Sequence, residues 1–92
     1  MVDAREVLAH PERTLRQLCE ALGVPFSEAM LSWPAGPRPT DGVWAKHWYA
    51  EVESSTAFRA PAAREIVIPA RLRSVYEESR EHYRRLRQFC LR

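Results

Sequence analysis

The sequence predicts a mainly α-helical unit of four to five helices joined by long, proline-rich connections. Three observations lead to this prediction. Apolar residues recur at helical spacing in several stretches, most of the seven prolines and three glycines lie between those stretches, and no segment forms a convincing sheet. A chain of 92 residues has room for one small domain or a fragment of one.

Residues 2–33 are predicted to form a helical pair. Val2 resembles the tail of a strand, and Asp3 can cap the short turn that follows it. Pro11 suits the first position of a helix, where a backbone N–H would be unpaired in any case. Gly23 stands where a left-handed C-cap belongs, so a helix is predicted over residues 11–22. Its apolar stripe has i, i+3, i+4, i+7 spacing and comprises Leu15, Leu18, Cys19 and Leu22.

Ser27 and Glu28 are expected to open a short second helix. Residues 34–42 then hold three prolines and two glycines and are predicted to form a loop. Residues 43–54 are predicted to be one helix with an aromatic stripe, because Trp44, Trp48 and Val52 follow each other at steps of four.

Residues 55–63 return to loop, and the apolar run at residues 66–68 is either a short extended segment or the lead-in to the last helix. That helix is predicted over residues 69–91, beginning at Pro69. Its narrow seam alternates steps of four and three residues and consists of Leu72, Tyr76, Ser79, Tyr83, Leu86 and Cys90.

Charge is distributed unevenly along the chain. Residues 69–92 contain seven arginines and three glutamates, so this part carries +4 and the first 68 residues carry −2. A solvated helix face explains such a basic stretch better than phosphate binding does, and nucleic acid is not expected as a partner. No apolar run is long enough for a membrane span, and the N-terminus does not resemble a secretory signal. We therefore expect a cytoplasmic protein, and the arginine-rich, alanine-rich composition suggests a bacterial source.

No catalytic constellation is visible in the sequence. The three glycines do not form a phosphate-binding loop or a nucleophile elbow. Cys19 and Cys90 lie far apart on apolar helix stripes, which predicts buried small side chains and neither a metal site nor a disulfide. No catalytic residue and no metal ligand is assigned.

The segment 38–49, RPTDGVWAKHWY, combines cations with aromatic rings beside a loop. Together they can hold an anionic or aromatic ligand. This reading makes Arg38 and Lys46 candidates for cofactor binding, and Trp44, His47 and Trp48 candidates for substrate binding. A simpler alternative stays open, in which the tryptophans belong to the core and Lys46 and His47 face water.

Two runs of the sequence resemble the C-terminal part of sulfotransferase-family proteins. Residues 2–26 read VDAREVLAHPERTLRQLCEALGVPF, which is similar to a family pattern of an "hP-E-x-T-L" helix followed by an "L-G-h-P-F" exit. Residues 27–49 continue as SEAMLSWPAGPRPTDGVWAKHWY and resemble a bacterial sulfotransferase-like branch that is loosely labelled as aminotransferase-associated.

The resemblance implies an α/β parent domain with a P-loop-like fold, which transfers sulfate from the donor PAPS to an acceptor. The phosphosulfate loop, the central sheet and the usual catalytic groups of that family lie toward its N-terminus and are not found in this sequence. The family's arginine-lysine-glycine segment would correspond to residues 36–42, which depart from it. Within that loop, only Arg38 could keep a phosphate contact.

We therefore expect a non-catalytic, truncated unit, with PAPS implied only for a full-length relative and an N-terminal P-loop half missing. The stripe of helix 11–22 and the Trp44/Trp48 stripe would then be exposed apolar faces, which promote association into a homo-oligomer. The alternative is a stand-alone helical interaction module, which associates with itself or binds an acidic partner through its basic last helix.

Overall fold

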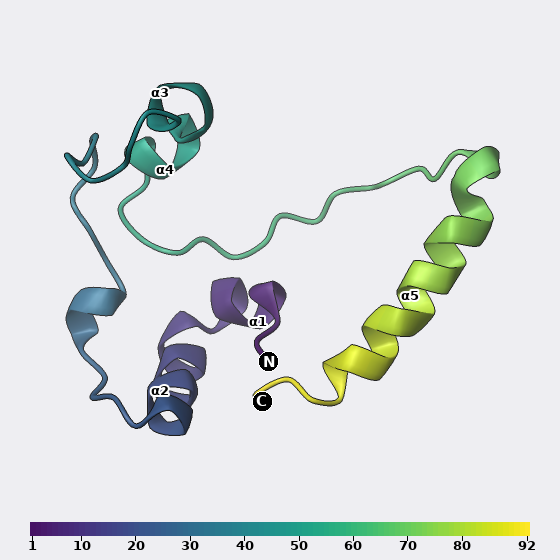
Figure 1. The fold of residues 1–92 in the computed structure, drawn as a ribbon, viewed down its shortest axis with the longest axis horizontal. Coiled ribbons are helices and arrows are strands. Elements are labelled where there is room, and N and C mark those ends of the chain that lie inside the picture. The colour runs from purple at the N-terminus through teal and green to yellow at the C-terminus, as the bar shows by residue number, and fades with distance from the viewer.

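Helices joined by coil make up the computed structural model, which describes all 92 residues (Figure 1). The helices are α1 (Ala4–Ala9), α2 (Pro11–Leu22), α3 (Ala45–Trp48), α4 (Ala50–Ser54) and α5 (Arg73–Arg87), with single 3-10 turns η1 (Glu28–Met30) and η2 (Ala70–Leu72). The one β pairing is an isolated antiparallel bridge between Ser32 and Ala57. The predicted mainly α class is confirmed, whereas the strand tail expected at Val2 is wrong.

Helices α1 and α2 form the best-packed part of the chain. The Asp3 side chain caps α1 by accepting a hydrogen bond from the Arg5 amide at 2.9 Å. Thr14 is 2% exposed, and its hydroxyl lies 3.1 Å from the Glu6 carbonyl of α1 and 2.9 Å from the His10 carbonyl. Helix α2 begins at Pro11 and ends at Leu22, and its C-cap Gly23 has a left-handed φ of 68°, as predicted.

The segment after α2 folds back along that helix. Arg16 of α2 places its guanidinium carbon 4.0 Å from the centre of the Phe26 ring, a cation–π distance. The Cys19 sulfur lies 3.9 Å from the Met30 sulfur. The second helix expected from Ser27 is only the 3-10 turn η1, capped by the Ser27 hydroxyl, which accepts from the Ala29 amide at 3.3 Å.

Trp33 anchors the loop of residues 34–42 to the segment that follows α4. Its amide donates to the Thr56 carbonyl at 2.9 Å, and its indole N–H donates to the Ser55 hydroxyl at 3.0 Å. Its ring also meets Phe58 edge to face, with the ring centres 5.2 Å apart. The loop is therefore irregular, as predicted, but it is held at its base.

The single aromatic helix predicted over residues 43–54 is wrong. The structure breaks it at Tyr49, whose φ of −103° and ψ of 11° are not helical, and leaves the short helices α3 and α4. Aromatic residues have modest helix propensity, neither helix has a side-chain cap, and helices this short are marginal unless they are packed. Trp44 and Trp48, expected in the core by the simpler reading, are 64% and 76% exposed.

The last helix is shorter than the predicted range of residues 69–91. Pro69 starts the chain turning into η2, regular α-helix begins only at Arg73, and it ends at Arg87. After Arg87 the chain turns toward the N-terminus, where the Leu91 amide donates a hydrogen bond to the Met1 carbonyl at 3.0 Å. Figure 1 shows the N- and C-termini side by side, with the rest of α5 standing apart from the other helices.

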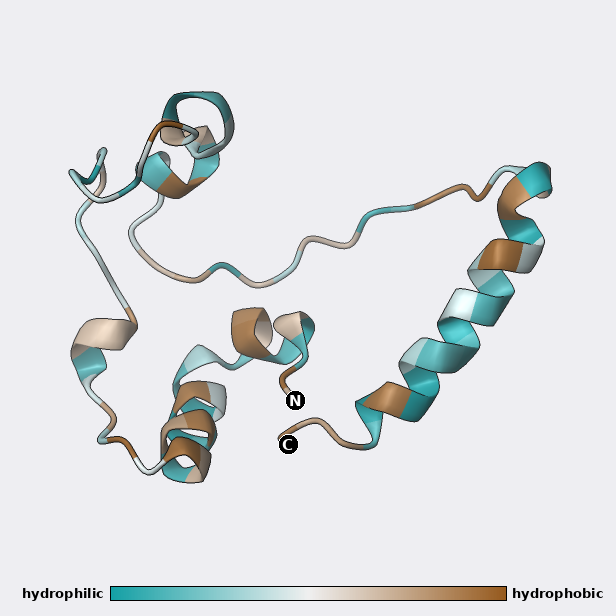
Figure 2. Cartoon of the chain, in the orientation of Figure 1, coloured by the Kyte–Doolittle hydropathy of each residue, from teal (hydrophilic) through white to brown (hydrophobic).

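The arrangement is open. Its Cα radius of gyration is 16.7 Å, whereas a compact domain of this length has about 12 Å. Only Thr14 and Cys19 are buried. Apolar positions, brown in Figure 2, recur along α5 and in the extended segment that leads to it. Ile66 and Val67 in that segment are exposed, and so is every residue of α5. None of the helices has the length and apolar character of a transmembrane segment.

Candidate functional site

The candidate site predicted at residues 38–49 contains a surface hollow of about 530 Å³. The proline-rich loop and the start of α3 form one side of it, and α4 contributes Glu53 from the other. The Gly36 amide donates to the Glu53 carbonyl at 2.7 Å, which holds the two sides together. The residues that line the hollow are Pro37, Arg38, Pro39, Asp41, Gly42, Val43, Ala45, Lys46 and Glu53.

The two predicted cofactor-binding residues, Arg38 and Lys46, lie in this hollow together. A local turn positions Arg38, because Asp41 Oδ2 accepts a hydrogen bond from the Arg38 amide at 3.1 Å. The same carboxylate oxygen lies 3.9 Å from Arg38 Nη1. Asp41 is 14% exposed, so it is a fixed neighbour of the arginine.

The charges of the hollow cancel. Arg38 and Lys46 are opposed by Asp41 and Glu53, and the lining is formally neutral. A phosphate or sulfate group is recognised by an excess of hydrogen-bond donors and positive charge. This hollow has no such excess, and it does not by itself fit the sulfate donor of the family resembled. Binding of a cofactor by Arg38 and Lys46 remains a prediction.

The three predicted substrate-binding residues lie outside the hollow. Trp44, His47 and Trp48 are all exposed and do not line it. The two indole rings lie near each other, with centres 6.1 Å apart and planes at 48°. They form an exposed aromatic pair outside the hollow that Arg38 and Lys46 line. Binding of a substrate by Trp44, His47 and Trp48 stays a prediction.

No three residues of the metal-binding types His, Cys, Asp and Glu are grouped so as to hold an ion. Both cysteines are free. Cys19 is buried, as predicted, whereas Cys90 is only half-buried.

The one pair of perturbed ionisable groups lies where the two ends of the chain meet. The Tyr83 hydroxyl donates to Asp3 Oδ2 at 2.6 Å. This hydrogen bond, followed by that from the Arg5 amide, lowers the pKa of Asp3 below its ordinary value of 3.8. It also raises the pKa of Tyr83 above 10.0. Eighty residues separate the two groups, so no local motif could have revealed the contact.

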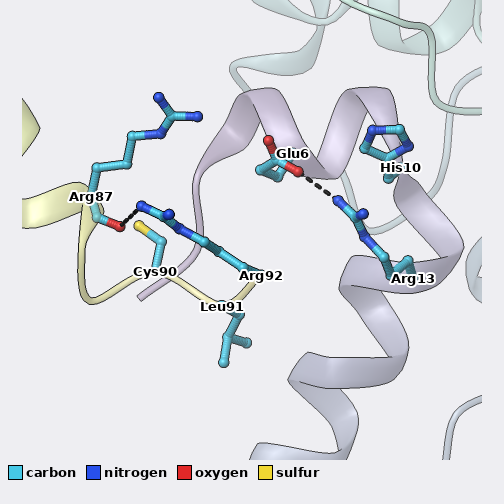
Figure 3. Close-up of a pocket in the computed structure, with 7 residues that line it drawn as sticks. All are labelled: Glu6, His10, Arg13, Arg87, Cys90, Leu91 and Arg92. Carbon is cyan, nitrogen blue, oxygen red and sulfur yellow. Dashed lines mark hydrogen bonds and ion pairs between the residues drawn. The ribbon is translucent and has the colours of Figure 1, made fainter.

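A second hollow beside this contact was also missed in the sequence. It has a volume of about 360 Å³ and is lined by Glu6, His10, Arg13, Arg87, Cys90, Leu91 and Arg92 (Figure 3). The excess of arginine over acid in residues 69–92 was the available signal. It did not show which of those arginines line a hollow together with Arg13.

Comparison with known protein families identifies the chain. The model of the sulfotransferase domain matches residues 1–79. The match covers most of the 92 residues, and the chain belongs to the sulfotransferase domain family. The resemblance inferred from residues 2–49 is thereby confirmed at the level of the family.

Two proteins of Arabidopsis thaliana are similar to the chain. Branched-chain-amino-acid aminotransferase-like protein 1 is 52% identical over 61 residues, and branched-chain-amino-acid aminotransferase-like protein 2 is 49% identical over 61 residues. In each case the match covers 66% of this chain and 11% of the relative, so the chain spans about a tenth of those proteins. Both are plant proteins, and the bacterial source suggested by composition finds no support in them. No solved structure matches the chain.

Proposed function

We propose that this chain is a non-catalytic, C-terminal segment of a sulfotransferase domain, and that its apolar faces pack on the rest of that domain. The observation that carries the proposal is exposure. This chain belongs to the sulfotransferase domain family, yet it buries only two of its 92 residues and leaves both Trp44 and Trp48 exposed. Exposed apolar surface of this extent is typical of a surface that another part of a protein covers.

In this proposal, sulfate transfer belongs to the whole protein and not to the chain alone. The neutral hollow of residues 37–53 lacks the charge for a donor site of its own. Arg38 and Lys46 would contact an anion only at an edge of a site completed by other parts of the domain. The use of PAPS follows the family resemblance and is part of the proposal.

The first experiment is a sulfate-transfer assay with labelled PAPS and a phenolic acceptor. We expect no turnover by the 92-residue chain. Turnover above the protein-free control, lost with Arg38→Ala but not with the matched variant Arg59→Ala, would contradict the non-catalytic assignment. Arg59 is an exposed arginine that does not line the hollow.

A chimeric protein tests the packing. A contiguous stretch of 61 residues in a chain of 92 must include residues 32–61, so Trp48 lies in the part matched by the plant relatives. The chimera is Arabidopsis aminotransferase-like protein 1 in which the matched stretch is replaced by that of this chain. Trp48→Ser should leave the free energy of unfolding of the chain alone nearly unchanged but lower that of the chimera by about 3 kcal/mol, as for loss of a buried tryptophan. Equal effects in both would contradict the proposal.

A second candidate, an interaction module that binds an acidic partner, is favoured by one feature of α5. Arg73, Arg80 and Arg87 recur every seven residues beside the exposed seam of Leu72, Tyr76, Tyr83 and Leu86. The other flank of the seam has Val75, His82 and Phe89, so neither flank offers a carboxylate to a second copy of α5. An acidic amphipathic helix complements the row of Arg73, Arg80 and Arg87 better than a second copy of α5 does.

Two measurements separate these partners. Light scattering of the chain at rising concentration tests whether it forms a homo-oligomer. A strictly monomeric species at every concentration would contradict a homo-oligomer. A synthetic helix with leucines at the seam and glutamates on both flanks tests the acidic partner. Its binding should weaken with added salt and with Arg80→Gln, while Arg59→Gln should leave it unchanged. Binding that ignores salt would contradict the interaction-module proposal.

A further inference from the structure

We propose that the hollow between the α1–α2 corner and residues 87–92 is a binding site for a tetrahedral oxyanion, either a free ion or the terminal phosphate of a larger molecule. The site does not depend on the proposed sulfotransferase role. Four of its seven lining residues, Arg87, Cys90, Leu91 and Arg92, lie beyond the residues that the family model matches. It shares no lining residue with the Arg38/Lys46 hollow and is separate from it.

The charge of the lining is the first argument. Three arginines, Arg13, Arg87 and Arg92, line the hollow with one acidic side chain, Glu6, so the lining side chains carry a formal +2 with His10 neutral. The terminal carboxylate of Arg92 in the 92-residue chain lowers this formal charge to +1. Asp3, just outside the lining, lies 3.7 Å from Arg87 and offsets part of this excess. The Arg38/Lys46 hollow has no excess at all, and of the two the terminal hollow is the one suited to an anion.

The donors that remain available are the second argument. Arg13 Nη2 donates to Glu6 Oε2 at 2.7 Å, and Arg92 Nη2 donates to the Arg87 carbonyl at 3.3 Å (Figure 3). Each contact uses one nitrogen, whereas a guanidinium has five N–H donors in a planar fork. The fork matches two oxygens of a phosphate or sulfate, which makes arginine the usual residue for such groups.

The third argument is that the walls are held in place from both ends of the chain. The Gln17 side-chain amide donates to the Arg92 carbonyl at 2.5 Å, and the Leu91 amide donates to the Met1 carbonyl at 3.0 Å. Its volume of about 360 Å³ falls within the roughly 300–1,000 Å³ of small-molecule pockets. An anion there would bridge Arg13 of α2 and Arg92 of the tail and so fasten the C-terminal segment to α2.

Thiol footprinting tests the proposal within one sample. Cys90 lines the hollow and is half-buried, whereas Cys19 is buried in α2. The 92-residue chain is treated with neutral iodoacetamide at constant ionic strength, with sodium phosphate or sodium sulfate replacing sodium chloride. Alkylation of Cys90 should fall saturably with the oxyanion, while Cys19 reacts slowly throughout. Cys19 therefore reports in every tube that the chain is folded.

Variants locate the effect. Arg92→Gln should weaken protection of Cys90 by about tenfold or more, the scale of a lost charge-assisted hydrogen bond. Arg92→Lys, which keeps the charge but not the fork, should be intermediate. Arg71→Gln removes the same charge from η2, outside the hollow, and should leave protection unchanged. Absence of saturation, or an equal loss with Arg71→Gln, would overturn the proposal.

Methyl phosphate distinguishes the two sources of the anion. Tighter protection than by inorganic phosphate would support a phosphate ester as the ligand, and weaker protection would support a free ion. Nuclear magnetic resonance provides the second readout, since the same titration should shift the amides of His10, Arg13 and residues 90–92. Shifts confined to the Arg38/Lys46 hollow would contradict the site.

Discussion

The hydroxyl of Tyr83 donates a hydrogen bond of 2.6 Å to the Asp3 carboxylate, which also caps α1. The Asp3 side chain, only 7% exposed, thus performs two tasks. Its Oδ1 accepts the hydrogen bond from the Arg5 amide at the start of α1, and its Oδ2 accepts the hydrogen bond from Tyr83 of α5. Arg87 adds a weaker contact to the same Oδ2 at 3.7 Å. Because the remainder of α5 is exposed, its position depends on these few contacts at its C-terminal end.

Asp3→Ala and Tyr83→Phe separate these two tasks. Asp3→Ala should lower the free energy of unfolding of the α1–α2 part by about 1 kcal/mol, the usual cost of a lost N-cap, and should also release α5. Tyr83→Phe should release α5 while leaving α1 capped. Amide hydrogen exchange would show faster exchange of residues 80–90 in both variants, but faster exchange of α1 only in Asp3→Ala. Unchanged exchange of residues 80–90 in Tyr83→Phe would contradict the role of this hydrogen bond.

The same contact should respond to pH at both ends of the scale. The hydrogen bond from Tyr83 is the largest cause of the lowered pKa of Asp3, so its stabilisation is complete above about pH 3.8 and is lost as pH falls through the lowered pKa. The pKa of Tyr83 is raised by the same bond, so that stabilisation is complete below about pH 10.0 and is lost as pH rises through the raised pKa. Carbon chemical shifts of Asp3 and Tyr83 would follow both titrations. An Asp3 carboxyl that titrates at or above 3.8 would be inconsistent with the contact.

Thr14→Val should destabilise the junction of α1 and α2. The buried hydroxyl is lost, but the Glu6 and His10 carbonyls keep the amide hydrogen bonds of His10 and Thr14, so the cost should be about 1 kcal/mol. The urea midpoint of unfolding measures it. Thr40→Val in the exposed loop is the matched control, because the Thr40 hydroxyl makes no hydrogen bond within the chain. A midpoint shift no larger than that of the control would contradict this role of Thr14.

Gly23→Ala tests the end of α2. Nothing lies within 4 Å of a Cβ built at Gly23, so the cost is conformational and should be about 1 kcal/mol for a side chain at φ 68°. Gly23→Asn should recover much of it, because asparagine tolerates this conformation. Thermal unfolding followed by circular dichroism compares the variants, and equal stability of Gly23→Ala and the original chain would show that α2 does not need this cap.

Local signals predicted helix α2 well. Pro11, the apolar stripe and Gly23 each act within a few residues, and the structure places α2 at the predicted bounds. The prediction of a single helix over residues 43–54 failed because the spacing of Trp44 and Trp48 fits a buried helix and an exposed one equally well. In this chain little packs on it, and a helix of modest propensity breaks at Tyr49.

The candidate site was predictable only in part, for a related reason. Arg38 and Lys46 lie eight positions apart, and a loop and a short helix bring them into one hollow. Their role in binding stays a prediction. Asp41 was visible in the sequence, but only the structure shows that Glu53 comes alongside and makes the hollow neutral. Arg13 and Arg92, which both line the terminal hollow, are 79 positions apart in the sequence, and a site of this kind depends on the tertiary fold.

Amide hydrogen exchange of residues 43–54 tests most directly whether this chain is a segment that the rest of a sulfotransferase domain covers. The exchange is measured in the 92-residue chain and in the chimera with the Arabidopsis protein, under identical conditions. We predict nearly unprotected exchange in the chain alone and protection at least about a hundredfold greater in the chimera, since covered elements open only with the larger structure. Equal exchange of this segment in the two proteins would contradict the account.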